Sequence, residues 1–280
     1  MTASMHPLLS ARDLRTWFPV TGGFWKRTVD HVRAVDGVSL DVFPGEIVAL
    51  VGESGCGKST LGYSLLGLVP PTSGTIELAG TPLDIAKPAS WKPFRRDFQI
   101  VFQDPYTSLN PRLTVFELLA EPLRTHGLVP RAGLRAAAAD LLRQVGLPED
   151  ALGRFPHAFS GGQRQRLCIA RALGLRPKLL VCDEVVSALD VSVQAQIVQL
   201  LLDLKREHGL ALLFITHDLS LVRAIADRVL VMNAGKIVEE GAAATLFANP
   251  QHPYTRTLLA AVPRMEKRGE REAKPVSETV

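Results

Sequence analysis

Residues 52–59 read GESGCGKS and match the pattern G-x-x-x-x-G-K-[ST] at every fixed position. The glycines of this segment allow the backbone to aim successive N–H groups at phosphate oxygens, and a helix start adds the positive end of its dipole. Lys58 can reach the β- and γ-phosphates of a nucleotide, and the Ser59 hydroxyl can bind Mg²⁺. The pattern predicts a triphosphate site built from Gly52, Glu53, Ser54, Gly55, Cys56, Gly57, Lys58, Ser59 and Thr60.

A pair of acidic residues follows a second apolar run. Residues 179–182 read LLVC, and Asp183 and Glu184 come directly after them. At the carboxyl end of a buried strand, Asp183 can hold Mg²⁺ directly or through water. Glu184 then lies at the mouth of the site, where its carboxylate can polarise an attacking water. Alone, such a pair is more often a solvated strand end, but a phosphate loop in the same chain favours a hydrolytic site.

Strands and helices alternate around these residues. The buried strand IVALV precedes the phosphate loop, and a helix over 58–69 follows it. Helical spacing dominates from 113 to 176. The remaining pattern predicts strands over 34–43, 74–79, 178–184 and 211–217, a helix over 193–209, and a hairpin over 228–241. This alternation predicts an α/β fold with a mostly parallel sheet, interrupted by a helical insert.

The composition is that of a folded protein. Of the 280 residues, 46% are hydrophobic and 21% charged, which excludes disorder over most of the length. No apolar run approaches the ~18 residues of a membrane span and the first residues lack a signal-peptide pattern, so we expect a cytosolic chain. Three scattered cysteines without a C-x-x-C pair do not indicate a disulfide framework, a zinc site or an iron–sulfur site. The net charge of +4 is compatible with nucleic acid or an anionic membrane surface as a partner, but a balance this mild is also typical of proteins that bind neither.

The segment FSGGQRQRLCIARAL, residues 159–173, resembles the signature motif of ATP-binding cassette (ABC) ATPases, whose core is LSGGQ. Phe159 stands where that core has leucine. The resemblance implies a P-loop NTPase (RecA-like) core of the ABC ATPase type, with an antiparallel β subdomain and an inserted α-helical subdomain. It also implies a head-to-tail dimer around ATP and Mg²⁺. The residues that would reach the partner's nucleotide are Ser160, Gly161, Gly162 and Gln163, with Asp190 of the segment SALD.

Three further positions resemble landmarks of this family. Gln103 resembles the glutamine that senses Mg²⁺ and the attacking water, and His217 resembles the histidine that hydrogen-bonds the γ-phosphate. The resemblance thus implies Glu184, His217, Gln103 and Lys58 as catalytic residues and Ser59, Gln103 and Asp183 as the Mg²⁺ site. Phe18 is the expected aromatic platform for adenine, with Trp17, Phe24 and Trp25 as alternatives.

The segments QDPYTSLNPR (103–112), VSALDVSVQAQ (186–196) and HPYTRTLL (252–259) narrow the resemblance to ATPase subunits of bacterial oligopeptide, dipeptide and nickel importers. Peptide uptake is the expected role. Val185 stands where peptide members usually carry proline, and the cysteine-containing extension that often follows HPYT is missing. Because of these two departures, nickel uptake stays an alternative.

The resemblance also implies partners and an arrangement of domains. The expected partners are two transmembrane permease subunits, a second and different ATPase chain, and an extracytoplasmic solute-binding protein, with no nucleic acid. The location would be peripheral, on the cytoplasmic face of the bacterial inner membrane. We expect one ATP-binding domain over 1–263, with a nucleotide-binding core at about 8–103 and 177–248. A helical subdomain at about 104–176 would dock on permease loops. The HPYT segment would occupy 249–263, and a charged tail would follow at 264–280.

Two functions other than transport would each leave a mark in the sequence. A soluble ABC ATPase acting on DNA would carry long coiled-coil arms, and one acting on ribosomes would carry two cassettes; the sequence has neither. An ATP-binding regulator without turnover would lack Glu184. Arg164, Arg166 and Arg171 have helical spacing, and we expect them to form a salt-bridged face rather than a DNA contact.

Overall fold

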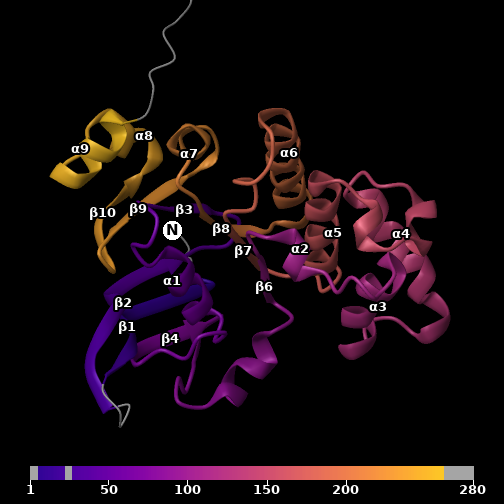
Figure 1. Cartoon of the computed structure of the whole chain (residues 1–280), viewed down its shortest axis with the longest axis horizontal. Coiled ribbons are helices and arrows are strands. Elements are labelled where there is room, and N and C mark those ends of the chain that lie inside the picture. The colour runs from indigo at the N-terminus through magenta and orange to yellow at the C-terminus, as the bar shows by residue number, and fades with distance from the viewer. Residues whose placement is uncertain (1–5, 23–26, 262–280) are drawn as a thin grey trace, which may run out of the picture.

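The structure, a computed structural model, describes residues 6–22 and 27–261 of the chain. These residues form two β-sheets, with helices on both faces of the larger sheet and a helical cluster at one side (Figure 1). The tail predicted at 264–280 lies outside the described residues, as do Phe24 and Trp25. No helix in the described ranges is long and apolar enough to cross a lipid bilayer.

The larger sheet has the strand order β10-β9-β3-β8-β7-β6, in which all neighbours are parallel except β9 and β10. Its strands β3, β7 and β8 are buried along their whole length, and their sequences are almost purely apolar, as strands covered on both faces require. The six strands are β3 (Ile47–Val51), β6 (Phe98–Val101), β7 (Leu179–Asp183), β8 (Ala211–Ile215), β9 (Arg228–Asn233) and β10 (Lys236–Ala242).

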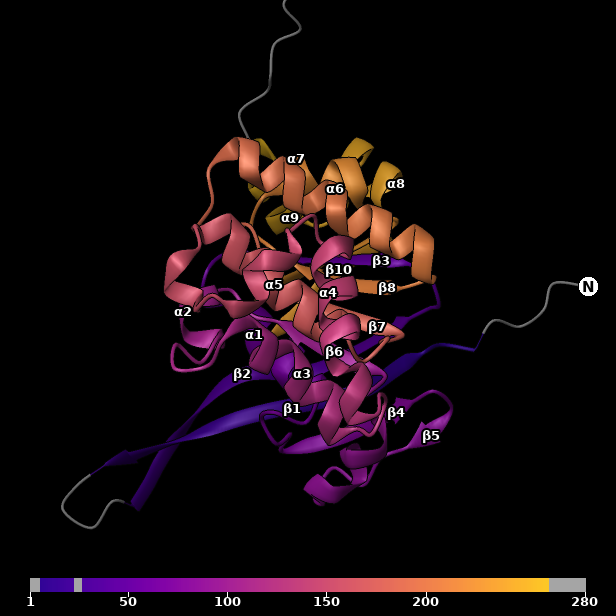
Figure 2. The ribbon, with the colours of Figure 1, turned by 90° about the vertical axis from the view of Figure 1, so that its right-hand side faces the viewer.

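The smaller sheet is antiparallel and has the order β2-β1-β4-β5. Its first two strands form a long hairpin that extends beyond the rest of the molecule (Figure 2). The strand predicted over 34–43 is thus the second half of a longer strand. The four strands are β1 (Leu9–Gly22), β2 (Arg27–Val42), β4 (Ser73–Leu78) and β5 (Thr81–Pro82).

Strand β3 shows how the layers are stacked. Val48 and Leu50 belong to the core shared with the first helix and the antiparallel sheet, whereas Ala49 and Val51, on the opposite face, pack against the C-terminal helices. Figure 2 shows the same order of layers around the larger sheet. The helices outside the helical cluster are α1 (Lys58–Leu65), α6 (Val191–His208), α7 (Leu219–Ile225), α8 (Ala243–Ala248) and α9 (Pro253–Ala260).

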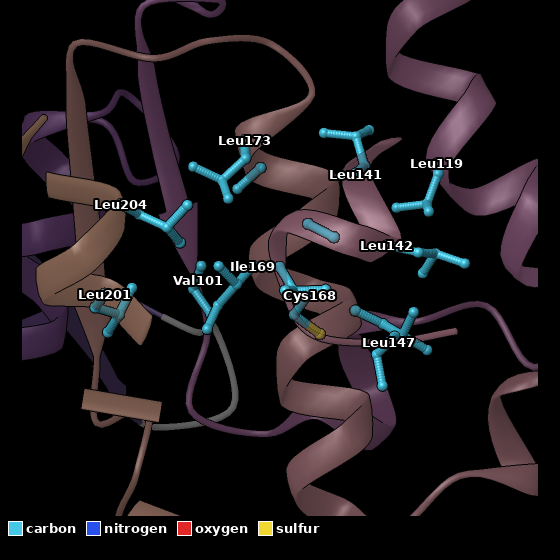
Figure 3. Packing of buried hydrophobic residues seen from close by; sticks show 14 of the residues in the cluster. Val101, Leu119, Leu141, Leu142, Leu147, Cys168, Ile169, Leu173, Leu201 and Leu204 are labelled. Carbon is cyan, nitrogen blue, oxygen red and sulfur yellow. The ribbon is translucent and has the colours of Figure 1, made fainter. Parts of the chain in front are cut away.

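The helical cluster lies between β6 and β7 in sequence and shares a core with the sheet. Figure 3 shows Leu119, Leu142 and Leu147 around Cys168 of the central helix, and the same cluster of buried residues continues to Val101 of β6. The helices are α2 (Pro105–Ser108), α3 (Val115–Thr125), α4 (Leu134–Gln144) and α5 (Gly161–Leu173), with short 3-10 turns at Arg131–Gly133, Glu149–Gly153 and Pro156–Ala158. A further 3-10 turn, Pro88–Phe94, precedes β6 and lies outside the cluster.

The predicted fold class is confirmed: a parallel α/β core, an antiparallel β part and an inserted helical part. The predicted hairpin over 228–241 is also present, as β9 and β10. The helix predicted over 58–69 is shorter, because it ends at Leu65. Gly67 takes a φ of 67° there, and a Cβ at this glycine would lie 2.5 Å from the Trp91 ring. The backbone turns in the left-handed region, which a helix cannot continue through.

Candidate nucleotide site

The phosphate loop connects β3 to α1 and depends on glycine at two places of close approach. Gly52 and Gly57 have φ values of 154° and 109°. A Cβ at Gly52 would lie 2.2 Å from the Met232 carbonyl oxygen, and one at Gly57 would lie 2.0 Å from the Ala34 carbonyl oxygen. Both distances are far inside van der Waals contact, so strands β9 and β2 hold the loop in a shape that only glycine allows.

Lys58 is buried within this loop. Its side chain lies at the first position of α1 and is only 4% exposed. The ammonium donates to the carbonyl oxygens of Gly52 at 2.9 Å and Glu53 at 2.8 Å. A buried charge without an acidic partner is costly, and these carbonyls offset part of that cost. The cation is therefore held at the loop, where a phosphate would be its natural counter-ion.

Asp183 ends β7 and contacts α1 through both of its carboxylate oxygens. Ser59 donates its hydroxyl to Oδ1 at 2.9 Å, and Tyr63 donates its hydroxyl to Oδ2 at 2.7 Å. Burial raises the pKa of Asp183 above its usual value, and the two hydrogen bonds oppose that rise. Tyr63 was not among the residues predicted for the site, although its i,i+4 spacing from Ser59 places both residues on one face of the helix.

Glu184 lies beside Asp183 and is held by residues from two other strand ends. Gln103 follows β6 and donates Nε2 to the carboxylate at 2.9 Å, while His217 follows β8 and has Nδ1 3.4 Å from the other oxygen. Glu184 has a φ of 46°, in the left-handed region. A non-glycine residue there costs about 1–2 kcal/mol, so the surrounding hydrogen bonds must impose this conformation.

The residues predicted for magnesium fit that ion chemically. Ser59 and Asp183 offer oxygen donors, and Gln103 adds an amide at the same edge of the sheet. The described part of the chain contains no group of three or more His, Cys, Asp and Glu side chains that would hold a metal by itself. The oxygen donors of Ser59 and Asp183 suit Mg²⁺, which usually takes a few protein oxygens and completes its shell with phosphate and water.

The signature segment forms the start of α5. Ser160 and Gln163 cap this helix reciprocally, since Ser160 Oγ accepts from the Gln163 N–H and Gln163 Oε1 accepts from the Ser160 N–H. A Cβ at Gly162 would lie 2.4 Å from Val193 of α6. In Figure 1 α5 lies in the helical cluster, and β7 and β8 separate it from α1. The structure therefore does not bring the signature to the phosphate loop of the same chain.

Asp190 caps the neighbouring helix α6. Its carboxylate accepts hydrogen bonds from the backbone N–H groups of Ser192 and Val193 and from the Ser192 hydroxyl, and these bonds lower its pKa. Val193 is also the residue that packs against Gly162. The predicted residues of the signature and of the segment SALD thus occur together at adjacent helix starts.

Phe18 lies in β1 opposite Val32 and is 41% exposed. Thr16, two residues earlier on the same face of the strand, hydrogen-bonds to Ser64 of α1 at 2.8 Å. Phe18 is therefore an exposed ring on the face of β1 that looks toward α1. Trp17 points to the other face, with the Arg33 guanidinium 4.8 Å from its ring centroid.

The arginines of α5 do not form the salt-bridged face that their spacing suggested. Arg164, Arg166 and Arg171 donate to the carbonyl oxygens of Pro156, Val145 and Ser108, respectively. Within residues 6–22 and 27–261 none of the three makes an ion pair with an acidic side chain. The reason is local: carbonyl oxygens at the ends of neighbouring turns lie within reach of each guanidinium and accept its hydrogen bonds.

Comparison with known proteins agrees with this geometry. A family model described as ABC transporter matches residues 35–187, which is more than half of the chain. The chain belongs to the ABC transporter family. A second model, described as the C-terminal region of oligopeptide/dipeptide transporters, matches residues 238–279. The C-terminal part of the chain is therefore similar to that region of oligopeptide/dipeptide transporters.

The glutathione import ATP-binding proteins GsiA of Escherichia coli K12 and Shigella flexneri are each 53% identical to this chain over 261 residues. The match covers 93% of this chain and 42% of each relative, so the chain spans less than half of their length.

Two solved structures are similar at 28% identity and a TM-score of 0.73. One is cbiO1 from Clostridium perfringens, described as part of the ABC transporter complex cbiONQ, and the match covers 87% of this chain and 91% of that one. The other is an ATP-binding cassette in a dimeric post-hydrolysis state bound to ADP and Pi, with 84% and 98% covered.

Proposed function

We propose that this chain binds and hydrolyses ATP as the energy-coupling subunit of a bacterial importer of peptides. The observation that carries the proposal is the position of Glu184. Its carboxylate lies next to the Ser59–Asp183 pair and is held by Gln103 and His217 from two further strand ends. A carboxylate oriented in this way, beside a phosphate loop, is what the hydrolysis of a bound triphosphate requires.

The phosphate loop binds the triphosphate. Its backbone N–H groups and Lys58 neutralise the β- and γ-phosphates, Thr60 contacts the α-phosphate, and the exposed ring of Phe18 stacks on adenine. Ser59, Asp183 and Gln103 would hold Mg²⁺, which supplies charge neutralisation to the phosphates when bound.

Hydrolysis uses Glu184 as the general base. Glu184 accepts a proton from water as the water oxygen forms a bond to the γ-phosphorus. The bond from that phosphorus to the β–γ bridging oxygen breaks, and ADP and phosphate leave. Lys58 stabilises the charge on the departing groups, while His217 and Gln103 fix the positions of the γ-phosphate and of the water.

The signature acts on a second nucleotide-bound chain. Ser160 and the N–H groups of Gly161 and Gly162 lie at the start of a 13-residue helix, a place suited to an anion. Because they lie away from the phosphate loop of their own chain, they are free to close on a partner's γ-phosphate, together with Gln163 and Asp190. The partner would be a second, different ATPase chain.

Transport requires partners at the membrane. The proposal places the chain on the cytoplasmic face of the inner membrane, against two permease subunits, with a solute-binding protein on the other side. An exposed aromatic surface between Gln103 and the signature is suited to contact the permeases. Tyr106 in it is 62% exposed and lies under the Arg164 guanidinium at 4.0 Å, and Phe155 is 40% exposed.

The relatives' names support a peptide substrate, since glutathione is a tripeptide derivative, whereas Val185 keeps nickel as the second candidate. The test is ATP-driven uptake into vesicles that contain the complete transporter, with peptides, glutathione and Ni²⁺ as competing substrates. Uptake of peptide that stops with Glu184→Gln is the expected result. ATP turnover with neither uptake nor permease association would contradict the transport role.

A further inference from the structure

The C-terminal helix α9 makes a direct hydrogen bond to the phosphate loop. The backbone N–H of Glu53 donates to the hydroxyl oxygen of Tyr254 at 3.1 Å, although 201 residues separate the two in sequence. The carbonyl oxygen of the same glutamate accepts from Lys58 Nζ at 2.8 Å. Glu53 is therefore fixed on both sides, by a lysine of the nucleotide site and by a tyrosine from a distant segment.

Tyr254 is itself held firmly. His252 caps α9 by accepting the Tyr254 N–H on Nδ1 at 3.2 Å. The carboxylate of Glu239 in β10 accepts the backbone N–H groups of Gln251 at 2.7 Å and His252 at 3.0 Å. The helix start is thus tied to the edge strand of the parallel sheet, and the tyrosine hydroxyl reaches the loop from a fixed base.

The tyrosine ring is part of the core on this side of the sheet. Tyr254 packs against the apolar cluster that contains Leu246 of α8 and Val51, the last residue of β3 before the loop. Burial raises the pKa of its hydroxyl, and the hydroxyl oxygen accepts the Glu53 N–H. Packing and hydrogen bonding together aim the side chain at one backbone amide.

We propose that Tyr254 is a positioning residue of the nucleotide site: by holding Glu53, it keeps the phosphate loop in the shape that accepts the triphosphate. The inference rests on the proposed function. A loop fixed in its binding shape before the ligand arrives loses less entropy on binding, so its affinity is higher. Glu239, His252 and Tyr254 all lie in the segment matched as the oligopeptide/dipeptide C-terminal region, 238–279. That segment thereby gains a role at the nucleotide site.

A purely structural role is the competing explanation. In that case the hydrogen bond fixes α9 on the sheet, and its loss lowers stability without changing the affinity for nucleotide. Tyr254→Phe separates the two, because it keeps the packed ring and removes only the hydroxyl oxygen. Thr257→Val is the matched control: it also removes a hydroxyl from α9, but at an exposed position where that hydroxyl donates to the Pro253 carbonyl of the same helix, at 3.2 Å.

The experiment measures the Kd for ATP with Mg²⁺ by titration of the full chain, together with hydrogen exchange at the Glu53 amide. For Tyr254→Phe we expect the Kd to rise about three- to tenfold, which is the range of a single lost hydrogen bond. Exchange at Glu53 becomes faster, and the melting temperature without nucleotide stays close to that of Thr257→Val. In the assembled transporter the KM for ATP rises while kcat at saturating ATP is unchanged.

Two results would overturn the inference. An unchanged Kd overturns it whether or not exchange at Glu53 accelerates, since faster exchange alone means that the tyrosine only anchors α9. An equal rise in Kd for Thr257→Val would also overturn it, because the effect would then belong to the helix and not to the bond. If the unmodified chain bound no ATP, the proposed ATPase function itself would be wrong. That failure is distinguishable from a failure of the role of Tyr254, in which the unmodified chain binds ATP and the variant binds it equally well.

Discussion

The two ends of the nucleotide site are built differently. At the phosphate loop, side chains from several strand ends already bond to one another, as in the pairs Ser59–Asp183 and Gln103–Glu184. At the signature, the side chains of Ser160 and Gln163 bond to each other's backbone N–H groups, at the start of their own helix. The first end joins side chains from separate strand ends, whereas the second consists of one helix start that caps itself.

Nucleotide binding and turnover are expected to depend on different ends of the site. Residues that share hydrogen bonds inside one chain are positioned by folding alone, so they can bind nucleotide before any partner arrives. In the proposed dimer, a helix start that caps itself would gain a ligand only when a second chain closes on it. We therefore predict that substitutions at the loop change the affinity of a single chain for ATP. Substitutions at the signature should change ATP turnover by the assembled transporter but not that affinity.

The largest effect is expected at Glu184. Glu184→Gln keeps the shape of the side chain and its contact with His217 but removes the base, so ATP turnover should fall about 10²–10⁴-fold while ATP still binds. Steady-state ATPase assays and nucleotide titration check this, with Glu207→Gln on the exposed face of α6 as a control. Turnover near the normal rate would break the assignment of Glu184 as base.

The signature should show a comparable loss, but only after assembly. Ser160→Arg places a long cation where a partner's nucleotide would lie, and we expect turnover by the transporter to fall about 10²–10³-fold, as when a donor to reacting charge is removed. Binding of ATP by the separate chain should not change.

Thr114 provides the matched control for that substitution. It caps α3 by the same reciprocal arrangement, with Glu117 in the place of Gln163. Thr114→Arg and Ser160→Arg should each cost about 0.5–2 kcal/mol of stability through the lost cap. Equal loss of turnover in both variants would mean that helix capping, not contact with a partner's nucleotide, explains the effect.

Lys58→Ala should act on the single chain. The ammonium has two carbonyl partners in the loop, and its loss removes a charged donor to phosphate that is worth about 10- to 100-fold in affinity. Isothermal titration with ATP and Mg²⁺ measures the change. The control is Lys178→Ala, which removes a lysine that is paired with Asp97 next to the opposite end of β7. An equal loss of ATP affinity in this control would mean that the effect of Lys58→Ala is not specific to the phosphate loop.

The loop and its acidic partners were predictable because their signals are local. A strand, a glycine-rich turn and a helix occur in succession at 47–65, and Asp183 and Glu184 end an apolar run. Parallel strands bring such ends to one edge, so their proximity followed from the pattern. The prediction of a helix over 58–69 was wrong at its C-terminal end, because the apolar spacing continues past Leu65. The helix stops there since the backbone turns into the left-handed region at Gly67.

Contacts between distant segments gave no comparable signal. Nothing in the motif HPYT indicates that its tyrosine would meet the Glu53 amide, because that contact depends on how β10 and α9 fold onto the sheet edge. The carbonyl partners of Arg164 and its neighbours were missed for the same reason, since backbone acceptors leave no mark in the sequence. The adenine contact of Phe18 stays a prediction.

The smallest expected effect is a difference in alkylation rate between Cys56 of the phosphate loop and Cys168 of the signature helix α5. Burial raises the pKa of Cys168, in the packed helical cluster, to about 11, so at pH 8 only about one thiol in a thousand is ionised. Its alkylation should be very slow and should rise about tenfold per pH unit below that pKa. Cys56, in the phosphate loop and 9% exposed, should react first and become slower with ATP and Mg²⁺ present. Mass spectrometry of each site measures both alkylation rates, with the unfolded chain as reference. If nucleotide protected Cys168 instead of Cys56, the ligand would act on the helical cluster and not on the loop.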